Sequence, residues 1–155
     1  MLWENQEEKV GEENKKLSTD EIFTRIYKNE PVSKEEIDFI DSKQMRDELK
    51  EKIDNAGYTI TTLAIECYIT PSHLHDFLNG KKQMSRDKLL AIFITLGYDT
   101  KKIQKLLKRF GYSELYSRNL RDFVILKGVK GKIGLDGINE KLEGESLDIL
   151  CQKKQ

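Results

Sequence analysis

The side chains best suited to chemistry lie close together in the sequence, in the segment that contains Cys67, His73, His75 and Asp76. Thiolate, imidazole and carboxylate groups all ligate metals and take part in catalysis. On a helix, however, His73 and His75 would point some 200° apart and could not hold one ion together. His73 and Asp76 would share a face, but two ligands do not complete a metal site. We therefore expect no metal, no cofactor and no enzymatic activity.

Glycines alternate with lysines in residues 127–134, which is a feature of some loops that bind phosphate groups. The P-loop of nucleotide-binding proteins ends in Gly-Lys-Ser/Thr, and this segment does not. We interpret the segment as a flexible basic turn between two helices, which could still contact a polyanion.

The composition favours short helices, each with one buried stripe. The chain has 155 residues, of which 37% are hydrophobic and 35% are charged, and it contains only two prolines. No apolar run approaches the ~18 residues that a membrane span needs. Cys67 and Cys151 lie far apart, and we expect both to be reduced, with Cys67 filling the core. We predict an all-α, cytoplasmic protein with no membrane association.

The net charge is zero, but the charges are unevenly distributed. Residues 1–80 carry 10 Lys and Arg against 18 Asp and Glu, a balance of −8. Residues 81–132 carry 14 against 4, a balance of +10, and residues 133–155 carry 3 against 5, a balance of −2. Two interpretations stay open: the basic segment binds a polyanion, or it pairs with the acidic N-terminal segment.

The N-terminal region is expected to hold an acidic arm followed by helices. Residues 1–17 have no hydrophobic periodicity and little apolar content, so we predict a disordered arm. Residues 18–43 should contain the N-terminal helices, the first of which is capped by Ser18 or Thr19.

A second helix start is indicated further along the N-terminal region. Ser33 and Glu36 form a capping-box pattern. This pattern predicts a helix with apolar residues on one side as far as Ile53, with a break possible at Asp41-Ser42.

Helix-start and helix-stop signals alternate through the rest of the chain. Each hydrophobic run follows a residue able to cap a helix, and all but the run after Thr59 precede a glycine able to adopt a left-handed conformation. The predicted caps are Thr59, Thr70 (with Pro71 at the first helical position), Ser85, Asp99, Ser117 and Asp136. The predicted terminators are Gly57, Gly80, Gly97, Gly111, Gly128 and Gly144.

The stretch from Thr59 to Tyr98 reads TITTLAIECYITPSHLHDFLNGKKQMSRDKLLAIFITLGY. It resembles the lambda-repressor/Cro-type helix-turn-helix family. The matching elements are Leu63-Ala64, Ile69 in the turn, Leu74 in the second helix, the Asn79-Gly80 terminator, the Ser85 cap and the helix of Leu89, Ile92 and Leu96. The resemblance implies a helix-turn-helix domain over residues 44–110. Residues 111–150 would then form a helical C-terminal extension, and residues 151–155 a free tail.

The resemblance also implies which residues face DNA, because the second helix of such a motif lies in the major groove. The set implied for base contact is Ser72, His73, His75 and Asp76. The set implied for phosphate contact is Thr59, Thr61, Thr62, Asn79, Lys81 and Lys82. The base-contact set lacks the Arg, Lys, Gln or Asn side chains that bond bidentately to guanine or adenine. The predicted base reading is therefore weak, and Ile60 stands where the family often has a backbone-contacting Gln.

These observations predict a transcriptional regulator that binds double-stranded DNA mainly through backbone contacts. The alternative is a protein-interaction adaptor built on a degenerate helix-turn-helix, since a fold can lose one function and keep its core. A third hypothesis is a small antitoxin or inhibitor with an arm that orders on its partner. A homodimer formed through the extension is compatible with the sequence, although most apolar residues there suit a core.

Overall fold

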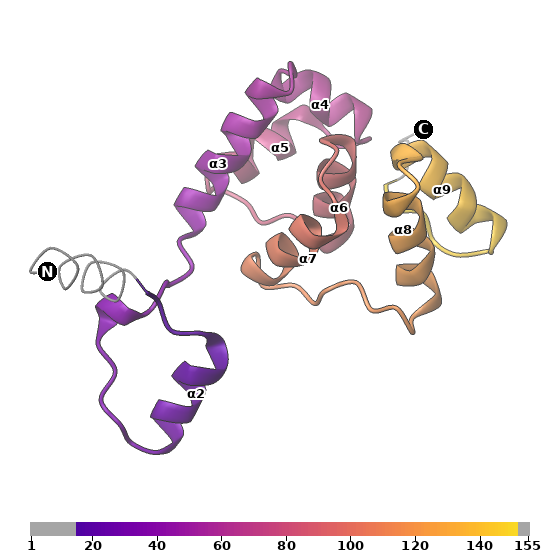
Figure 1. The fold of residues 1–155 in the computed structure, drawn as a ribbon. Helices are drawn as coiled ribbons and strands as arrows, with labels where there is room; N and C mark the ends of the chain where they lie inside the picture. The colour runs from indigo at the N-terminus through magenta and orange to yellow at the C-terminus, as the bar shows by residue number, and fades with distance from the viewer. Residues whose placement is uncertain (1–14, 152–155) are drawn as a thin grey trace, which may run out of the picture. The chain divides into compact units, whose positions relative to one another are not determined.

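The computed structural model describes residues 15–151, and all regular secondary structure in this range is helical (Figure 1). The all-α prediction is therefore confirmed. The chain divides into two compact units, residues 1–40 and residues 41–155, which we describe separately. None of the described helices is both long and apolar enough to cross a bilayer. Most of the predicted acidic arm and the end of the predicted tail, residues 1–14 and 152–155, lie outside the described residues.

The first unit contains α2 (Thr19–Tyr27) and a short 3-10 helix, η1 (Lys34–Glu36). Ser18, one of the two predicted caps, caps α2 through a reciprocal capping box. The backbone N–H of Leu17 donates to the carbonyl of Glu36 at 2.8 Å, so this end of the predicted disordered arm is hydrogen-bonded. No described residue of this unit is buried. The local order of the unit therefore rests on caps and hydrogen bonds rather than on a hydrophobic core.

The helix predicted to run from the Ser33–Glu36 capping box towards Ile53 is wrong in its first part. The capping box is present, but it opens only the 3-10 turn, after which Ile37 is extended with φ −111° and ψ 127°. A separate helix, α3 (Ser42–Asn55), begins after Asp41. The Asp41 carboxylate accepts two backbone N–H groups of the first turn, at 3.0 and 3.2 Å. The predicted break at Asp41-Ser42 is therefore confirmed, since Asp41 caps a helix that begins at Ser42.

The second unit begins with α3 and continues through α4 (Ile60–Glu66), α5 (Pro71–Leu78), α6 (Arg86–Thr95) and α7 (Thr100–Arg109). Three predicted caps accept backbone N–H groups as expected, namely Thr59, Ser85 and Asp99. Thr70 precedes α5 without a side-chain hydrogen bond, and Pro71 occupies the first helical position. Four predicted terminators have φ between +79° and +85°, namely Gly57, Gly80, Gly97 and Gly111.

Helix α6 forms the centre of the second unit. Every residue from Leu89 to Ile94 is buried, and α6 packs against α4, α7 and α9. Helix α3 buries Met45, Leu49 and Ile53, which recur at helical spacing on one face. A helix that is apolar on all sides must be covered on all sides, whereas a helix with one stripe lies at the edge of the core.

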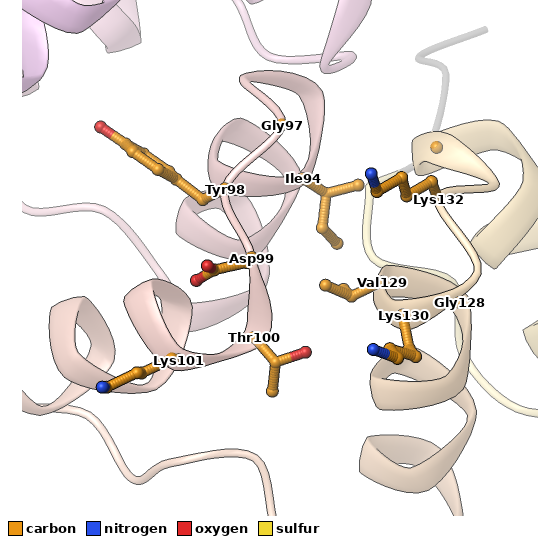
Figure 2. A pocket seen from close by; sticks show the side chains of 11 residues that line it. Ile94, Gly97, Tyr98, Asp99, Thr100, Lys101, Gly128, Val129, Lys130 and Lys132 are labelled. Carbon is orange, nitrogen blue, oxygen red and sulfur yellow. The ribbon is translucent and has the colours of Figure 1, made fainter.

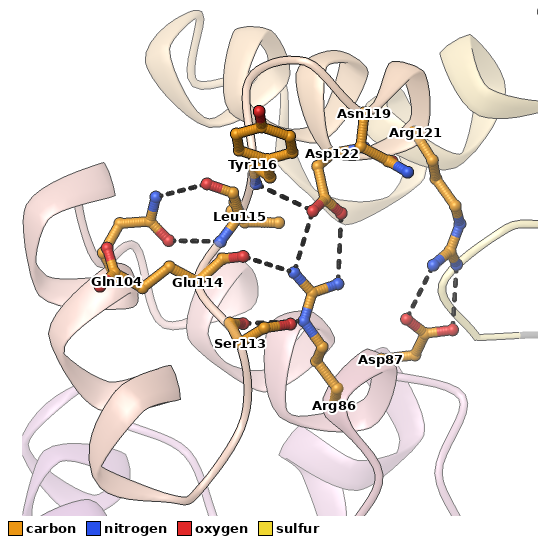
Figure 3. A network of polar contacts seen from close by, with 10 residues as sticks. All are labelled: Arg86, Asp87, Gln104, Ser113, Glu114, Leu115, Tyr116, Asn119, Arg121 and Asp122. Carbon is orange, nitrogen blue, oxygen red and sulfur yellow. Dashed lines mark hydrogen bonds and ion pairs between the residues drawn. The ribbon is translucent and has the colours of Figure 1, made fainter.

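The C-terminal extension contains two helices, α8 (Leu120–Lys130) and α9 (Gly134–Gly144), which lie side by side (Figure 1). Helix α8 also contacts α7, and α9 contacts α6. Two reciprocal ion pairs join α6 to α8 (Figure 3). Arg86 donates to both carboxylate oxygens of Asp122 at 3.1 and 3.2 Å, and Arg121 donates to both of Asp87 at 2.9 and 3.0 Å. The extension is therefore part of the same compact unit as α3 to α7.

The loop that leads into α8 is hydrogen-bonded to side chains of α6 and α7 (Figure 3). Arg86 also donates to the carbonyl oxygens of Ser113 and Glu114, at 3.0 and 3.1 Å. Gln104 of α7 exchanges two hydrogen bonds with the backbone of Leu115, at 2.7 and 2.9 Å. The backbone groups of this irregular segment cannot bond within a helix, so these side chains satisfy them instead.

Both predicted ends of α8 are wrong. The helix is capped by Asn119 rather than Ser117, because the Asn119 amide oxygen accepts a first-turn N–H at 3.0 Å. It continues past Gly128 to Lys130. A Cβ atom at Gly128 would lie 2.3 Å from Cγ1 of Ile138. This glycine therefore allows α8 and α9 to approach closely instead of ending the helix.

The start of α9 and the tail also differ from the prediction. Helix α9 begins at Gly134, and the predicted cap Asp136 lies within its first turn. Its carboxylate accepts the hydroxyl of Tyr68 at 2.7 Å and so joins α9 to the connection between α4 and α5. Cys151, predicted to begin a free tail, is buried. The tail is fixed up to this point because the N–H of residue 150 donates to the buried Asn139 side chain at 2.8 Å.

Candidate nucleic-acid interface

Helices α4 and α5 pack against each other across a short connection of four residues, 67–70. Ala64 and Leu74 are fully buried, and Ile69 in the connection is 4% exposed. These three residues, which are among those that carry the resemblance, therefore lie in the hydrophobic core. Tyr68 adopts the left-handed conformation, with φ +58°, which turns the chain between the two helices.

One face of α5 is exposed and polar. Ser72, His75 and Asn79 are all exposed, whereas Leu74, Phe77 and Leu78 are buried. Ser72, His75 and Asn79 are spaced by three and four residues, so they form one stripe along the helix. We call this set the α5 stripe. It combines two residues predicted to contact bases, Ser72 and His75, with one predicted to contact phosphate, Asn79, and all three are exposed.

His73, also predicted to contact bases, uses both of its ring nitrogens in hydrogen bonds within the protein. Its Nε2 atom lies 3.1 Å from the carbonyl oxygen of Gln83, and its Nδ1 atom lies 3.1 Å from Nζ of Lys88. A lysine ammonium can only donate, so Nδ1 accepts and Nε2 carries the proton that goes to Gln83. The ring thus fastens the α5–α6 loop, which argues against the predicted contact with DNA.

Asp76 organises the two lysines that follow α5. Its backbone carbonyl accepts the N–H groups of Lys81 and Lys82 at 2.8 and 3.3 Å. Its carboxylate lies 3.5 Å from Nζ of Lys82. The Asp76 charge, which would repel a phosphate, is therefore partly compensated by a neighbouring cation.

The fold brings cations from α3 to the C-terminal end of α5. Nζ of Lys50 lies 3.5 Å from Oδ1 of Asn79. Arg46 lies over Gly80, where a Cβ atom would be 2.8 Å from its Nη2. Sequence reasoning missed both residues, although their spacing of four on one helix was a signal that they share a face.

A cleft of about 550 Å³ opens beside this end of α5. Four cationic residues line it, namely Arg46, Lys81, Lys82 and Arg109, and no carboxylate residue does. We call it the basic cleft. Phe77 and Phe110 are also among its lining residues, and their rings lie 5.8 Å apart. A concave surface with one sign of charge attracts phosphate groups.

The threonines at the start of α4 are engaged in capping. The N–H of Thr59 donates to Oγ1 of Thr62 at 2.9 Å, and the N–H of Thr62 donates to Oγ1 of Thr59 at 3.1 Å. Thr61, between them, is exposed. The predicted phosphate contacts of Thr59 and Thr62 would thus compete with an existing capping box.

The two thiols are unsuited to chemistry. Burial raises the pKa of the Cys67 thiol to about 12 and that of the Cys151 thiol to about 11. Both cysteines are free, and the predicted burial of Cys67 in the core is confirmed. Within residues 15–151, no three His, Cys, Asp or Glu side chains gather into a group that could hold a metal ion.

No family model matches the sequence, and comparisons with curated proteins and with solved structures also gave no match. The function is therefore argued from the residues of this chain.

Proposed function

We propose that residues 44–110 form a helix-turn-helix domain of the lambda-repressor type and that the protein is a DNA-binding regulator. In this proposal α4 and α5 are the two helices of the motif. The α5 stripe faces the major groove, and the basic cleft contacts the phosphate backbone. Contacts to phosphates position the protein, and few side chains read bases.

The observation that carries the proposal is the continuity of the α5 stripe with cations from two parts of the chain, α3 and the loop after α5. Asn79 at the end of the stripe contacts Lys50, and Gly80 lies under Arg46. Lys81 and Lys82 follow directly. An exposed polar helix face that ends in a positively charged cleft suits a duplex, because the groove edges and the phosphates lie side by side.

The stripe also limits what the protein can read. Ser72 forms undiscriminating hydrogen bonds, so His75 and Asn79 are the side chains left to distinguish bases. Affinity should therefore depend steeply on salt and only modestly on sequence.

A second function, a protein-interaction adaptor, is favoured by an apolar patch on the extension. Tyr116, Leu120 and Phe123 are 59%, 53% and 43% exposed. Leu120 and Phe123 are spaced by three residues on α8, so they share a face. Exposed apolar patches of this kind are typical of protein-binding surfaces.

Fluorescence anisotropy with labelled duplexes separates the two functions. The duplexes are the region upstream of the protein's own gene and a scrambled sequence. The paired variants Lys81→Gln/Lys82→Gln and Arg46→Gln/Lys50→Gln should each weaken binding about tenfold at low salt, because each removes two phosphate contacts. The variant Lys105→Gln/Lys141→Gln removes the same charge from exposed positions on α7 and α9 and should bind as the wild type does.

Two results would contradict DNA binding. The first is no anisotropy change with a folded wild-type sample at low salt. The second is an equal loss of affinity in all three charge-matched variants, which would show only a general charge effect. Either result would leave the apolar patch on α8 as the surface to pursue, with Phe123→Ser as its first variant.

A further inference from the structure

We propose that a second cavity binds a small organic anion with an apolar body. The residues that line it lie between Ile94 and Gly134, after the α5 stripe in the sequence. Its volume is about 600 Å³. It lies between the α6–α7 turn and the end of α8 with the α8–α9 turn (Figure 2). None of its lining residues lines the basic cleft. The inference does not rest on the proposed function and goes beyond it.

The walls of the cavity combine apolar and cationic groups. Figure 2 shows Ile94 and Thr100 on one side of the gap, and Val129, Lys130 and Lys132 on the other. Ile94 is 9% exposed, and Val129 packs against the hydrophobic core. The floor therefore suits a hydrocarbon or aromatic group, and the lysines suit an acidic group at one end of it.

The lysines on this wall are available to a ligand. Among residues 15–151, neither Lys130 nor Lys132 forms an ion pair, and both are exposed. Of the described residues that line the cavity, Asp99 alone carries a carboxylate. Its side chain points away from the gap in Figure 2 and caps α7 by accepting the N–H of Lys102 at 2.8 Å. Two uncompensated cations facing an apolar floor select for a negative ligand.

The end of α8 fixes the position of Lys132. Lys132 adopts the left-handed conformation that commonly ends a helix, with φ +54°. Its N–H donates to the carbonyl oxygen of Val129 at 3.1 Å, and the N–H of Ile133 donates to that of Gly128 at 3.3 Å. The backbone on this wall of the cavity is therefore hydrogen-bonded, and the Lys132 side chain extends from a fixed point.

The size of the cavity indicates the class of ligand. Sites for small organic molecules have volumes of about 300–1,000 Å³, and this cavity falls within that range. An inorganic phosphate would leave the apolar floor exposed to water. An aromatic or alkyl carboxylate, sulfonate or phosphate ester would fill the floor and reach both lysines.

The test uses two fluorescent probes that differ mainly in charge, anilinonaphthalene sulfonate and its neutral analogue phenylnaphthylamine. The full-length protein should bind the sulfonate saturably and the neutral probe more weakly. Lys130→Gln/Lys132→Gln should weaken sulfonate binding about tenfold and leave the neutral probe unchanged, because each partly exposed ion pair contributes a few-fold. Lys105→Gln/Lys141→Gln, which lowers the net charge equally, should leave both unchanged.

Amide chemical shifts measured by NMR locate the site. Saturating sulfonate should move the amides of Gly97, Thr100, Val129 and Gly134. Shifts centred on Tyr116, Leu120 and Phe123 would overturn the proposal, as would equal sulfonate affinity in all variants or no saturable binding to folded protein. None of these readouts depends on DNA, so this site and the DNA interface can fail separately.

Discussion

Replacing Arg86 with methionine would remove the guanidinium that joins α6 to α8 while keeping much of the apolar stem. Arg86 donates two hydrogen bonds to Asp122 and one each to the carbonyl oxygens of Ser113 and Glu114. The Asp122 carboxylate would retain the bond from the backbone N–H of Tyr116 at 2.9 Å. Asp122 is 8% exposed, so water could replace the lost partners only in part.

The cost follows from this burial. Removing one partner of a buried ion pair costs about 3–5 kcal/mol, because the other charge is left uncompensated. The Arg86 and Asp122 side chains are 20% and 11% exposed, so some of that penalty is relieved by solvent. We expect the free energy of unfolding to fall by about 2–3 kcal/mol, with a fall in Tm of roughly 10 °C.

Urea unfolding of the full chain, followed by circular dichroism, measures this loss. Arg121→Met breaks the reciprocal pair, in which the Asp87 side chain is 37% exposed, and should cost about 1–2 kcal/mol. Arg118→Met, at an exposed position just before α8, should change stability by less than about 0.5 kcal/mol. If Arg86→Met were no more destabilising than Arg118→Met, the ion pairs would not be what fastens the extension.

Three further outcomes are expected. Gly128→Ala should destabilise the protein by about 1–3 kcal/mol in the same urea assay, because its Cβ would clash with α9, whereas Gly144→Ala, with open space, should not. Lys132→Gly should raise stability by about 0.5 kcal/mol through relief of left-handed strain while weakening anilinonaphthalene sulfonate binding. Cys67 and Cys151 should resist Ellman's reagent at neutral pH until urea unfolds the chain, because burial raises both thiol pKa values; rapid reaction in the native state would contradict their burial.

The pKa shifts of the thiols also fix the sign of a pH effect. Their folded pKa values lie above the ordinary value of 9.0. The folded state therefore keeps its full advantage from the neutral thiols below pH 9 and loses it as pH rises towards 11. The measurement is the free energy of unfolding of the wild type and of Cys67→Ala from pH 9 to pH 11. If the wild type became more stable relative to this variant as the pH rose, burial of the thiol would be contradicted.

The helices of the central region could be predicted from the sequence because their ends are set by neighbouring residues. A capping side chain such as Ser85 or Asp99 bonds to an N–H three residues later. A glycine such as Gly97 takes a left-handed conformation whatever packs nearby. Signals of this kind survive in a single sequence because they need no distant partner.

The wrong predictions occurred where distant residues decide the structure. Gly128 has the type expected of a terminator, but Ile138 of another helix occupies the space beside it. Asp136 has the type expected of a helix cap, but it lies within the first turn of α9 and its carboxylate accepts the hydroxyl of Tyr68. Such pairings depend on how helices pack, which local patterns do not specify.

The residues of the candidate site could be predicted only in part. Ser72 and His75 were predicted from the resemblance to the helix-turn-helix family, and both are exposed on α5. Arg46 reaches the basic cleft from α3, more than thirty residues before the lysines that it joins. The density of positive charge beside α5 is therefore a property of the fold that the linear charge count understates.

The most direct test of DNA binding is the salt dependence of the affinity for duplex DNA. A plot of log Kd against log salt concentration gives the number of phosphates neutralised, with about 0.9 per contact. The proposal predicts a steep slope for the wild type and a slope shallower by about two in Lys81→Gln/Lys82→Gln. A slope that is the same in the wild type and in this variant, or no binding by folded protein at low salt, would contradict it.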